Sequence, residues 1–163
     1  AFADLASRRE DMVLVLVGAE EDFPFDKVQK ICGDCREQLR RVSFTPYPER
    51  YMAAADIFCL PSHREGFGQV IIEAGACGVP TVASRIYGIT DAVEENKTGL
   101  LFTAGNVAML THQLQALVEN RELRRQMGNA ARVRAQELFS SQKITEGMLA
   151  IYDLLLERIE TCK

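Results

Sequence analysis

Two glutamates stand at a suggestive spacing in the stretch REGFGQVIIEAGACGVP, residues 64–80, where seven residues separate Glu65 from Glu73. A carboxylate accepts hydrogen bonds, often two at once, and this suits a pair of sugar hydroxyls. Glu65 is followed by a glycine, whereas Glu73 lies in an otherwise almost wholly apolar run. A buried carboxylate without a partner is costly or becomes protonated. We therefore expect Glu73 either to form an ion pair with a neighbouring helix or to accept hydrogen bonds from a diol of a ligand.

The glycines between the two glutamates predict a phosphate site. Gly66 and Gly68 allow a positive φ and a close approach of the backbone to a ligand. At a helix start, the N–H groups of Gly68, Gln69 and Val70 would be free donors, and together with the helix dipole they would bind an anion. Glycines also occur in ordinary turns, so this feature alone does not distinguish a phosphate site from a turn without a ligand. Because carboxylates repel phosphate, the glutamates would flank it and hold a sugar at each end, which describes a nucleotide-sugar.

The elements that would position these residues are strands alternating with helices. Apolar runs predict strands, and the first of them, MVLVLVG, reads as buried on both faces; the strands lie at 12–18, 41–45, 56–62, 80–85 and 98–102. Helices are expected at 26–39, within 46–56, and at 69–77, 106–119, 120–139 and 141–159, with Asn106 and Asn120 as N-caps. This alternation predicts the α/β class, with a doubly wound, Rossmann-like parallel sheet, helices on both faces and a helical C-terminus.

Ligands in such sheets bind beyond the carboxyl ends of the strands. The loops that matter therefore follow Val17, Thr45, Pro61 and Ser84. The stretch with the two glutamates is one of these loops.

Composition narrows the class of protein. A chain of 163 residues with 47% apolar and 26% charged residues fits one globular domain. Its net charge of −4 gives no basic surface for nucleic acid. No apolar run is long enough to span a bilayer, and the N-terminal residues lack the order of a signal peptide. We expect a cytoplasmic protein with no nucleic-acid partner.

The five cysteines fit a reducing compartment. Cys32 and Cys35 have the spacing of half a zinc site, but no second pair exists to complete four ligands. Helix-surface or part-buried thiols are the preferred interpretation, and no metal site is expected.

The stretch AADIFCLPSHREGFGQVIIEAGACGVPTVAS, residues 54–84, resembles the donor-binding C-terminal domain of family 4 retaining glycosyltransferases, which have the GT-B fold. The shared pattern is a strand, Pro-Ser, E-G-F-G, four residues, E-A, a helix of small residues and G-x-P. Glu65 and Glu73 occupy the two glutamates of that family's E-x7-E motif. The similarity extends over roughly residues 11–158.

The resemblance implies a role for each site residue. Glu65 would contact the transferred sugar and help to place its anomeric carbon, and Glu73 would hold the ribose hydroxyls. The Gly18-Ala19 turn would lie loosely near the nucleobase. Backbone N–H groups for the sugar and diphosphate would come from Gly66, Phe67, Gly68, Gln69 and Val70, and the nucleobase would lie near Thr45, Pro46 and Tyr47.

The implied activity is transfer of a hexosyl unit from a UDP- or GDP-sugar, with retention at the anomeric centre and without a metal or other cofactor. The acceptor would be a glycan or a lipid-linked sugar, in the synthesis of a polysaccharide or lipopolysaccharide. Two alternatives stay open. One is a nucleotide-sugar epimerase of GT-B architecture, and the other is a non-catalytic module that binds a nucleotide-sugar or a partner.

The resemblance also implies parts that these residues do not supply. The family has an acceptor-binding N-terminal domain, and a first strand whose loop carries an Arg and a Lys that clamp the diphosphate. We expect residues 1–163 to be a single donor-binding domain, a fragment of a longer two-domain enzyme and inactive alone. The parent would take its acceptor through the N-terminal domain and could bind the cytoplasmic face of a membrane. Arg64, Arg85 and Lys97 are not expected to replace the clamp.

Without that first strand, the sheet would have an open seam between strands 12–18 and 56–62. The two strands could pair directly, or the chain could dimerise through the exposed edge. A second departure lies at Tyr87-Gly88-Ile89-Thr90-Asp91, where the family has Gly-Gly-Ile-Pro-Glu. This difference bears on the shape of the sugar pocket.

Overall fold

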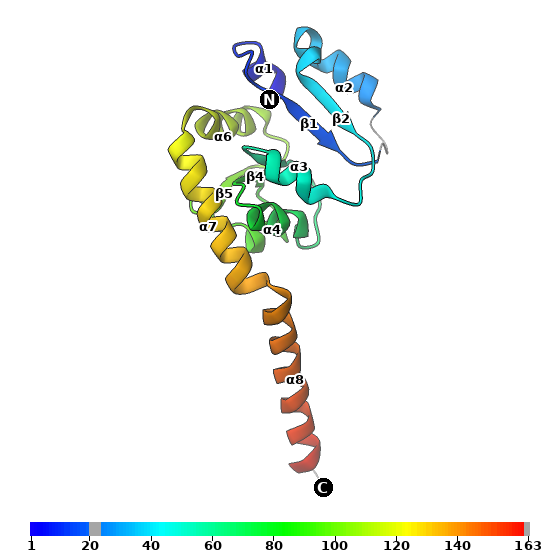
Figure 1. Cartoon of the computed structure of the whole chain (residues 1–163), viewed down its shortest axis with the longest axis vertical. Helices are drawn as coiled ribbons and strands as arrows, with labels where there is room; N and C mark the ends of the chain where they lie inside the picture. The colour runs from blue at the N-terminus through cyan, green and yellow to red at the C-terminus, as the bar shows by residue number, and fades with distance from the viewer. Residues whose placement is uncertain (20–23, 162–163) are drawn as a thin grey trace.

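The computed structural model describes residues 1–19 and 24–161 (Figure 1). The chain begins with α1 (Phe2–Ala6), β1 (Leu14–Val17), α2 (Phe25–Cys32), the 3₁₀ helix η1 (Gly33–Gln38), β2 (Leu39–Val42) and α3 (Pro48–Ala54). It continues with β3 (Phe58–Leu60), α4 (Gln69–Ala76), β4 (Thr81–Ser84), α5 (Ile89–Ala92) and β5 (Gly99–Phe102). It ends with α6 (Val107–Glu119), α7 (Arg121–Phe139) and α8 (Ser141–Thr161). The alternation of strands and helices confirms the predicted α/β class.

The strands form two parallel sheets. One has the order β3-β4-β5, and the other pairs β1 with β2 from Leu14↔Leu39 to Val17↔Val42. Within the described residues β1 and β3 do not pair, so the sheet has the seam that the sequence predicts and the alternative of direct pairing is wrong. Figure 1 shows β1 and β2 set apart from β4 and β5.

The three-stranded sheet holds the core of the molecule. On one of its faces, Ala83 and Leu101 pack with Ile71 of α4 and Ile89 of α5. On the other face, Val82, Leu100 and Phe102 pack with residues of α6 and α7. Alternate residues of β4 and β5 therefore point to opposite covered faces, as expected of a parallel sheet buried on both sides.

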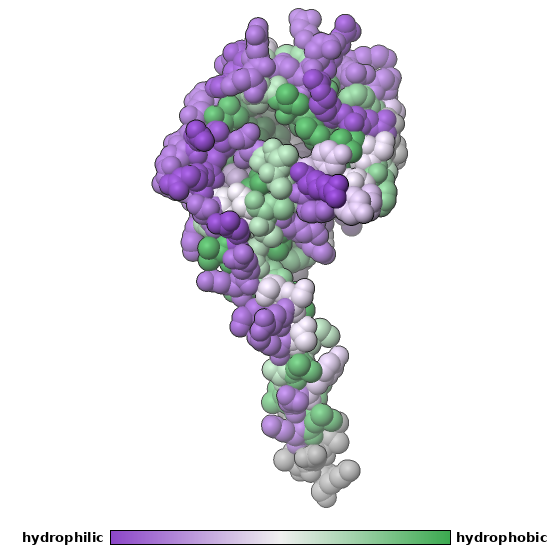
Figure 2. All heavy atoms as spheres, in the orientation of Figure 1, coloured by the Kyte–Doolittle hydropathy of each residue, from purple (hydrophilic) through white to green (hydrophobic). Residues whose placement is uncertain are grey.

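The smaller sheet differs from the prediction that residues 12–18 are buried on both faces. Val13, Val15 and Val17 are 57%, 44% and 40% exposed. Figure 2 shows apolar residues following the position of β1 on the surface. Successive residues of a strand point to opposite faces. The face of β1 with Leu14 and Leu16 is therefore partly covered, and the face with Val15 and Val17 is open.

Several element boundaries also differ. The helix expected at 26–39 ends at Cys32, because Gly33 has φ 55° and breaks the helical path into a 3₁₀ turn. The second strand begins at Leu39 and ends at Val42, where 41–45 was expected. The short helix α5 was not predicted. The caps are confirmed, because the side chains of Asn106 and Asn120 accept hydrogen bonds from Met109 N and Leu123 N.

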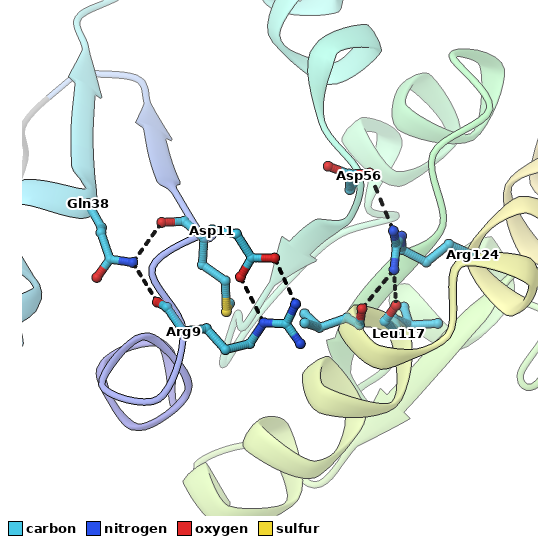
Figure 3. Close-up of polar contacts among 8 residues, drawn as sticks. Arg9, Asp11, Gln38, Asp56, Leu117 and Arg124 are labelled. Carbon is cyan, nitrogen blue, oxygen red and sulfur yellow. Dashed lines mark hydrogen bonds and ion pairs between the residues drawn. The ribbon is translucent and has the colours of Figure 1, made fainter.

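Two polar clusters fix the chain around the start of β1 and the corner between α6 and α7 (Figure 3). Nε2 of Gln38 donates to the carbonyls of Arg9 and Met12, at 2.9 and 3.0 Å, and so fixes the entry to β1. Arg124 donates to the carbonyls of Leu117 and Val118 at the end of α6, at 2.6 and 2.9 Å. The same guanidinium lies 3.7 Å from a carboxylate oxygen of Asp56, just before β3.

Of the cysteines in the described residues, Cys32, Cys35, Cys59 and Cys77 are free thiols. Cys32 and Cys35 are buried, more so than the helix-surface or part-buried thiols that the sequence predicts. Burial raises the pKa of the Cys59 thiol on β3 to about 11, so this thiol is neutral at physiological pH. Among the described residues, no three or more His, Cys, Asp or Glu side chains gather as a metal site would require.

The C-terminal helix α8 points away from the body of the molecule (Figure 1). It follows α7 after a single extended residue, Ser140, with φ −65° and ψ 147°. Apolar side chains on α8 stay about half exposed, among them Ile144, Met148, Ile151, Tyr152 and Leu155. Within the described residues, no helix combines the length and apolar character that crossing a membrane requires.

Candidate functional site

The start of α4 is built around Gly68, which follows the carboxyl end of β3. Gly68 is the N-cap residue with φ 67° and ψ 42°, in the left-handed region. A Cβ at this position would lie 3.2 Å from Cδ1 of Ile71 and 3.6 Å from Cγ1 of Ile89. Conformation and space both therefore favour glycine. Gly66 is different, because its φ is not positive and a Cβ there would meet nothing within 4 Å.

The backbone at this helix start presents free donors. Ile71 N donates to Gly68 O at 2.8 Å, whereas Gln69 and Val70 come too early in the helix for an intrahelical acceptor. Both residues are exposed, whereas Gly68, the third predicted donor, is buried. The positive end of the helix dipole lies at the same place. Free amides and a helix dipole at one place suit an anionic group such as phosphate, and the phosphate site stays a prediction.

Glu73 lies one turn into α4 and is half-buried. Nε2 of Gln69 donates a hydrogen bond to Oε1 of Glu73 at 3.1 Å. Within residues 1–19 and 24–161, Glu73 makes no ion pair with a neighbouring helix, so that interpretation is wrong. The helix is apolar in composition but is not buried all round, since only Ile71, Ala74 and Gly75 of its residues are buried. The carboxylate keeps one oxygen available to accept hydrogen bonds at the surface.

Glu65 is half-buried and lies on the loop that leads to α4. Its Cγ lies 3.7 Å from where a Cβ on Gly68 would be, so the side chain begins next to the helix start. In the part of the chain that the structure describes, its carboxylate forms no hydrogen bond or ion pair. The two glutamates therefore lie on either side of the Gly68 amide in sequence, one before the helix start and one a turn after it.

Gly88 is a site residue whose importance sequence reasoning missed. It caps α5 with φ 86°, and a Cβ here would lie 2.4 Å from Gly66 O and 2.7 Å from Glu65 O. Only glycine allows this contact, so the 65–66 backbone rests directly on the turn before α5. The sequence showed Gly88 only as part of an altered motif. The positive φ and the contact across 22 residues could not be read from it.

The predicted nucleobase turn connects β2 to α3. Tyr47 N donates to Oγ1 of Thr45 at 3.2 Å, and the guanidinium of Arg50 lies 4.4 Å from the centre of the Tyr47 ring. Sγ of Cys77, at the end of α4, lies 3.8 Å from Glu49 O. The turn formed by Thr45, Pro46 and Tyr47 thus precedes a helix that packs against α4, and Tyr47 is exposed.

The Gly18-Ala19 turn borders a separate hollow of about 160 Å³. Leu16 and Val17 line it from β1, and Phe25 and Val28 line it from α2. None of the residues at 45–47 or 65–73 lines this hollow. Gly18 N donates to Val42 O at 3.0 Å, which holds the turn against the end of β2.

Arg64, Arg85 and Lys97, the basic residues considered as replacements for the diphosphate clamp, differ in their ion pairs. Arg85 is hydrogen-bonded to Glu95, and Lys97 pairs with Glu94 at 3.0 Å. Both cations thus already have carboxylate partners. Arg64 is exposed and, among the described residues, forms no ion pair.

A family model described as "Glycosyl transferases group 1" matches residues 1–134 of the chain. The chain belongs to this family. Among curated relatives, the capsular polysaccharide biosynthesis glycosyltransferase CapM of Staphylococcus aureus is 27% identical over 98% of this chain and 42% of CapM. The D-inositol 3-phosphate glycosyltransferase of Pseudarthrobacter chlorophenolicus is 41% identical over 83% of this chain and 34% of that protein.

Two solved structures share the fold of this chain. Sucrose-phosphate synthase from Thermosynechococcus elongatus aligns with a TM-score of 0.83 and 26% identity, over 96% of this chain and 42% of that one. Anabaena HepE in complex with UDP-glucose aligns with a TM-score of 0.73 and 26% identity, over 91% of this chain and 44% of that one. The glycosyltransferase chain therefore spans less than half the length of these relatives.

Proposed function

We propose that this group 1 glycosyltransferase chain is the nucleotide-sugar donor-binding domain of a retaining, family 4 hexosyltransferase. The observation that carries this proposal is the start of α4, where the exposed residues Gln69 and Val70 have unpaired amides and lie in sequence between two half-buried glutamates. The solved complexes of the related HepE with UDP and with UDP-glucose support a nucleotide-sugar ligand. The nucleoside diphosphate would be UDP or GDP.

In this proposal, the amides of Gly68, Gln69 and Val70 bind the diphosphate, joined by those of Gly66 and Phe67 nearer the sugar. Glu73, oriented by its hydrogen bond from Gln69, accepts from the two ribose hydroxyls. Glu65 accepts from hydroxyls of the transferred sugar and sets the angle of its anomeric carbon. Thr45, Pro46 and Tyr47 face the nucleobase.

The reaction is proposed to proceed without a metal. Negative charge develops on the leaving diphosphate, and donors already aimed at that position stabilise it without reorganising. The helix start supplies part of this stabilisation. Arg85 and Lys97 already pair with carboxylates, and Arg64 is a single cation on the surface, so the rest would come from basic residues elsewhere in the whole enzyme.

The whole enzyme would be a longer, two-domain protein of which this chain is one domain. Its second domain would bind the acceptor, a glycan or a lipid-linked sugar, in polysaccharide or lipopolysaccharide synthesis. The relationship to CapM, a capsular polysaccharide biosynthesis glycosyltransferase, supports this setting. We place the enzyme in the cytoplasm, with peripheral contact to the membrane, and the open edge of β1 is where a dimer would form.

Substitution of the two glutamates in the full-length enzyme tests the proposal. Glu73→Ala should weaken binding of the matching nucleotide roughly ten- to a hundredfold, because hydrogen bonds to a charged group are lost. Glu65→Ala should leave nucleotide binding nearly unchanged and reduce transfer by roughly a hundredfold, because the reacting carbon is misplaced. Calorimetry and a transfer assay report these separately.

Exposed Glu137 on α7 offers the matched control, and Glu137→Ala should change neither measurement. If Glu73→Ala behaves like this control, the ribose assignment is wrong. Product analysis with donor alone separates a transferase from an epimerase, since only an epimerase would change the sugar without an acceptor.

A second candidate is a non-catalytic module that binds a partner. The exposed valines of β1 are the observation in its favour. Failure of the full-length protein to bind UDP, GDP or a nucleotide-sugar would favour this module over the transferase, and nucleotide binding would count against it.

A further inference from the structure

The last turn of α7 contacts the loop that carries the proposed donor site. The rings of Phe139 and Phe67 lie 5.6 Å apart between centroids, with their planes tilted by 56°. Phe67 lies between Glu65 and the first residue of α4, and its side chain is still 42% exposed. Phe139 is half-buried and is the last residue of α7. Aromatic pairs at this separation contribute beyond the area that they bury.

Arg134 contacts both Phe139 and the segment that contains α5. Its guanidinium lies 5.5 Å from the centre of the Phe139 ring, and Nη2 donates to Asp91 O at 2.8 Å. Nη1 lies 3.9 Å from a carboxylate oxygen of Glu94. The Arg134 side chain is 24% exposed and that of Glu94 is 44% exposed, so these contacts are only partly shielded from water. Nε of Arg134 is buried and has no partner within the structure's described residues.

The two turns held by α7 also touch each other. Gly88, at the start of α5, rests against the backbone of Glu65 and Gly66, with no room for a Cβ. Phe139 contacts the first turn, Arg134 contacts the second, and each of these two side chains touches the other. The end of α7, the 65–70 loop and α5 thus contact one another beside the proposed sugar end of the donor site.

We propose that Phe139 and Arg134 are positioning residues that set the conformation of the 65–70 loop. Neither residue belongs to the E-x7-E motif, and neither is placed against the donor. They act through Phe67 and through the α5 turn. Their importance for the donor rests on the proposed function of this site, but their effect on the loop does not.

Hydrogen exchange of the ligand-free full chain tests the positioning. In Phe139→Ala, the hydrogen-bonded amides beside the loop and in α5, those of Ile71, Ile89, Thr90 and Val93, should exchange roughly two- to tenfold faster, the loss expected for one aromatic pair. Amides of β4, at 81–84, should keep their protection. Phe139→Tyr, which retains the ring, should match the wild type. Leu138→Ala removes an exposed side chain from the same turn and should also match it.

Two outcomes would overturn the proposal. One is equal exchange of the Ile71, Ile89, Thr90 and Val93 amides in Phe139→Ala and Leu138→Ala. The other is a uniform rise that includes β4, since this would mean that Phe139 only stabilises the fold. Phe139→Leu provides the same comparison if the alanine variant does not fold, because it keeps apolar bulk and loses the ring.

Arg134 has its own comparison. Arg134→Ala should speed exchange mainly at 88–92, because the hydrogen bond to Asp91 O is lost, and Arg134→Lys should restore part of the protection. Titration of the full-length enzyme with UDP-glucose, UDP and GDP then gives the consequence for the donor. The Phe139→Ala dissociation constant should rise by a similar factor. If the wild type binds none of these nucleotides, the proposed function fails, while the exchange comparison still decides the positioning role.

Discussion

At the scale of single residues, glycine is required for different reasons at Gly68 and Gly88, and it is not required at Gly66. Gly68 needs its left-handed conformation to start α4, and Gly88 needs the absence of a Cβ to let the 65–66 backbone pass. Gly66 needs neither. The sequence predicted the site residues by type and spacing, because a motif preserves both. It could not rank the glycines, because a contact between distant backbones leaves no local pattern.

Replacement of these glycines by alanine should separate the two roles. Gly88→Ala should lower the free energy of unfolding by about 1–3 kcal/mol or displace the 65–66 loop, because both conformation and space oppose a Cβ. Gly66→Ala should leave stability nearly unchanged. Urea denaturation measures both variants. Equal destabilisation by the two substitutions would show that the contact between these two turns is not as tight as described.

At the scale of elements, features with a clear local signal were predicted correctly from the sequence, whereas a helix end at one glycine and a very short helix were not. The Asn106 and Asn120 caps were found because an N-cap is a local, chemical feature. The end of α2 was missed because residues 33–38 continue a helical composition while Gly33 changes the backbone. The short helix α5 was missed because it has too few residues for a periodic pattern.

The corner between α6 and α7 makes a prediction at this scale. Arg124→Ala should destabilise the chain by about 1–2 kcal/mol, because two carbonyls at the end of α6 lose a charged donor. The neighbouring Arg125 pairs with Glu122 on the solvent side, and Arg125→Ala should have little effect. Thermal unfolding compares the two. A larger shift for Arg125→Ala would contradict the role given to Arg124.

At the scale of the whole molecule, the division into two sheets was predictable and its consequence for burial was not. The seam followed from the family's first strand, which these residues do not supply, and the structure has this seam. The sequence still predicted that residues 12–18 are buried on both faces. An apolar composition shows that a strand could be buried, but it does not show whether other residues pack against each face. Both principal apolar clusters belong to the β3-β4-β5 part.

This division predicts unequal local stability. A two-stranded sheet with one open face is marginal on its own. Native-state hydrogen exchange should therefore show amides of 14–17 opening at a lower free energy than those of 81–84. Equal protection in the two sheets would mean that the chain unfolds as one unit and that the seam has no energetic consequence.

The proposed donor site at the start of α4 is tested most directly by amide chemical shifts during nucleotide titration. UDP, GDP and UDP-glucose should each be added to the chain and to the full-length enzyme, in the wild type and in Glu73→Ala. We predict that the matching nucleotide shifts the amides of Gly68, Gln69 and Val70, and that Glu73→Ala weakens this response roughly tenfold or more. No shift at these amides with any nucleotide in the full-length enzyme, or an unchanged response in Glu73→Ala, would contradict the assignment.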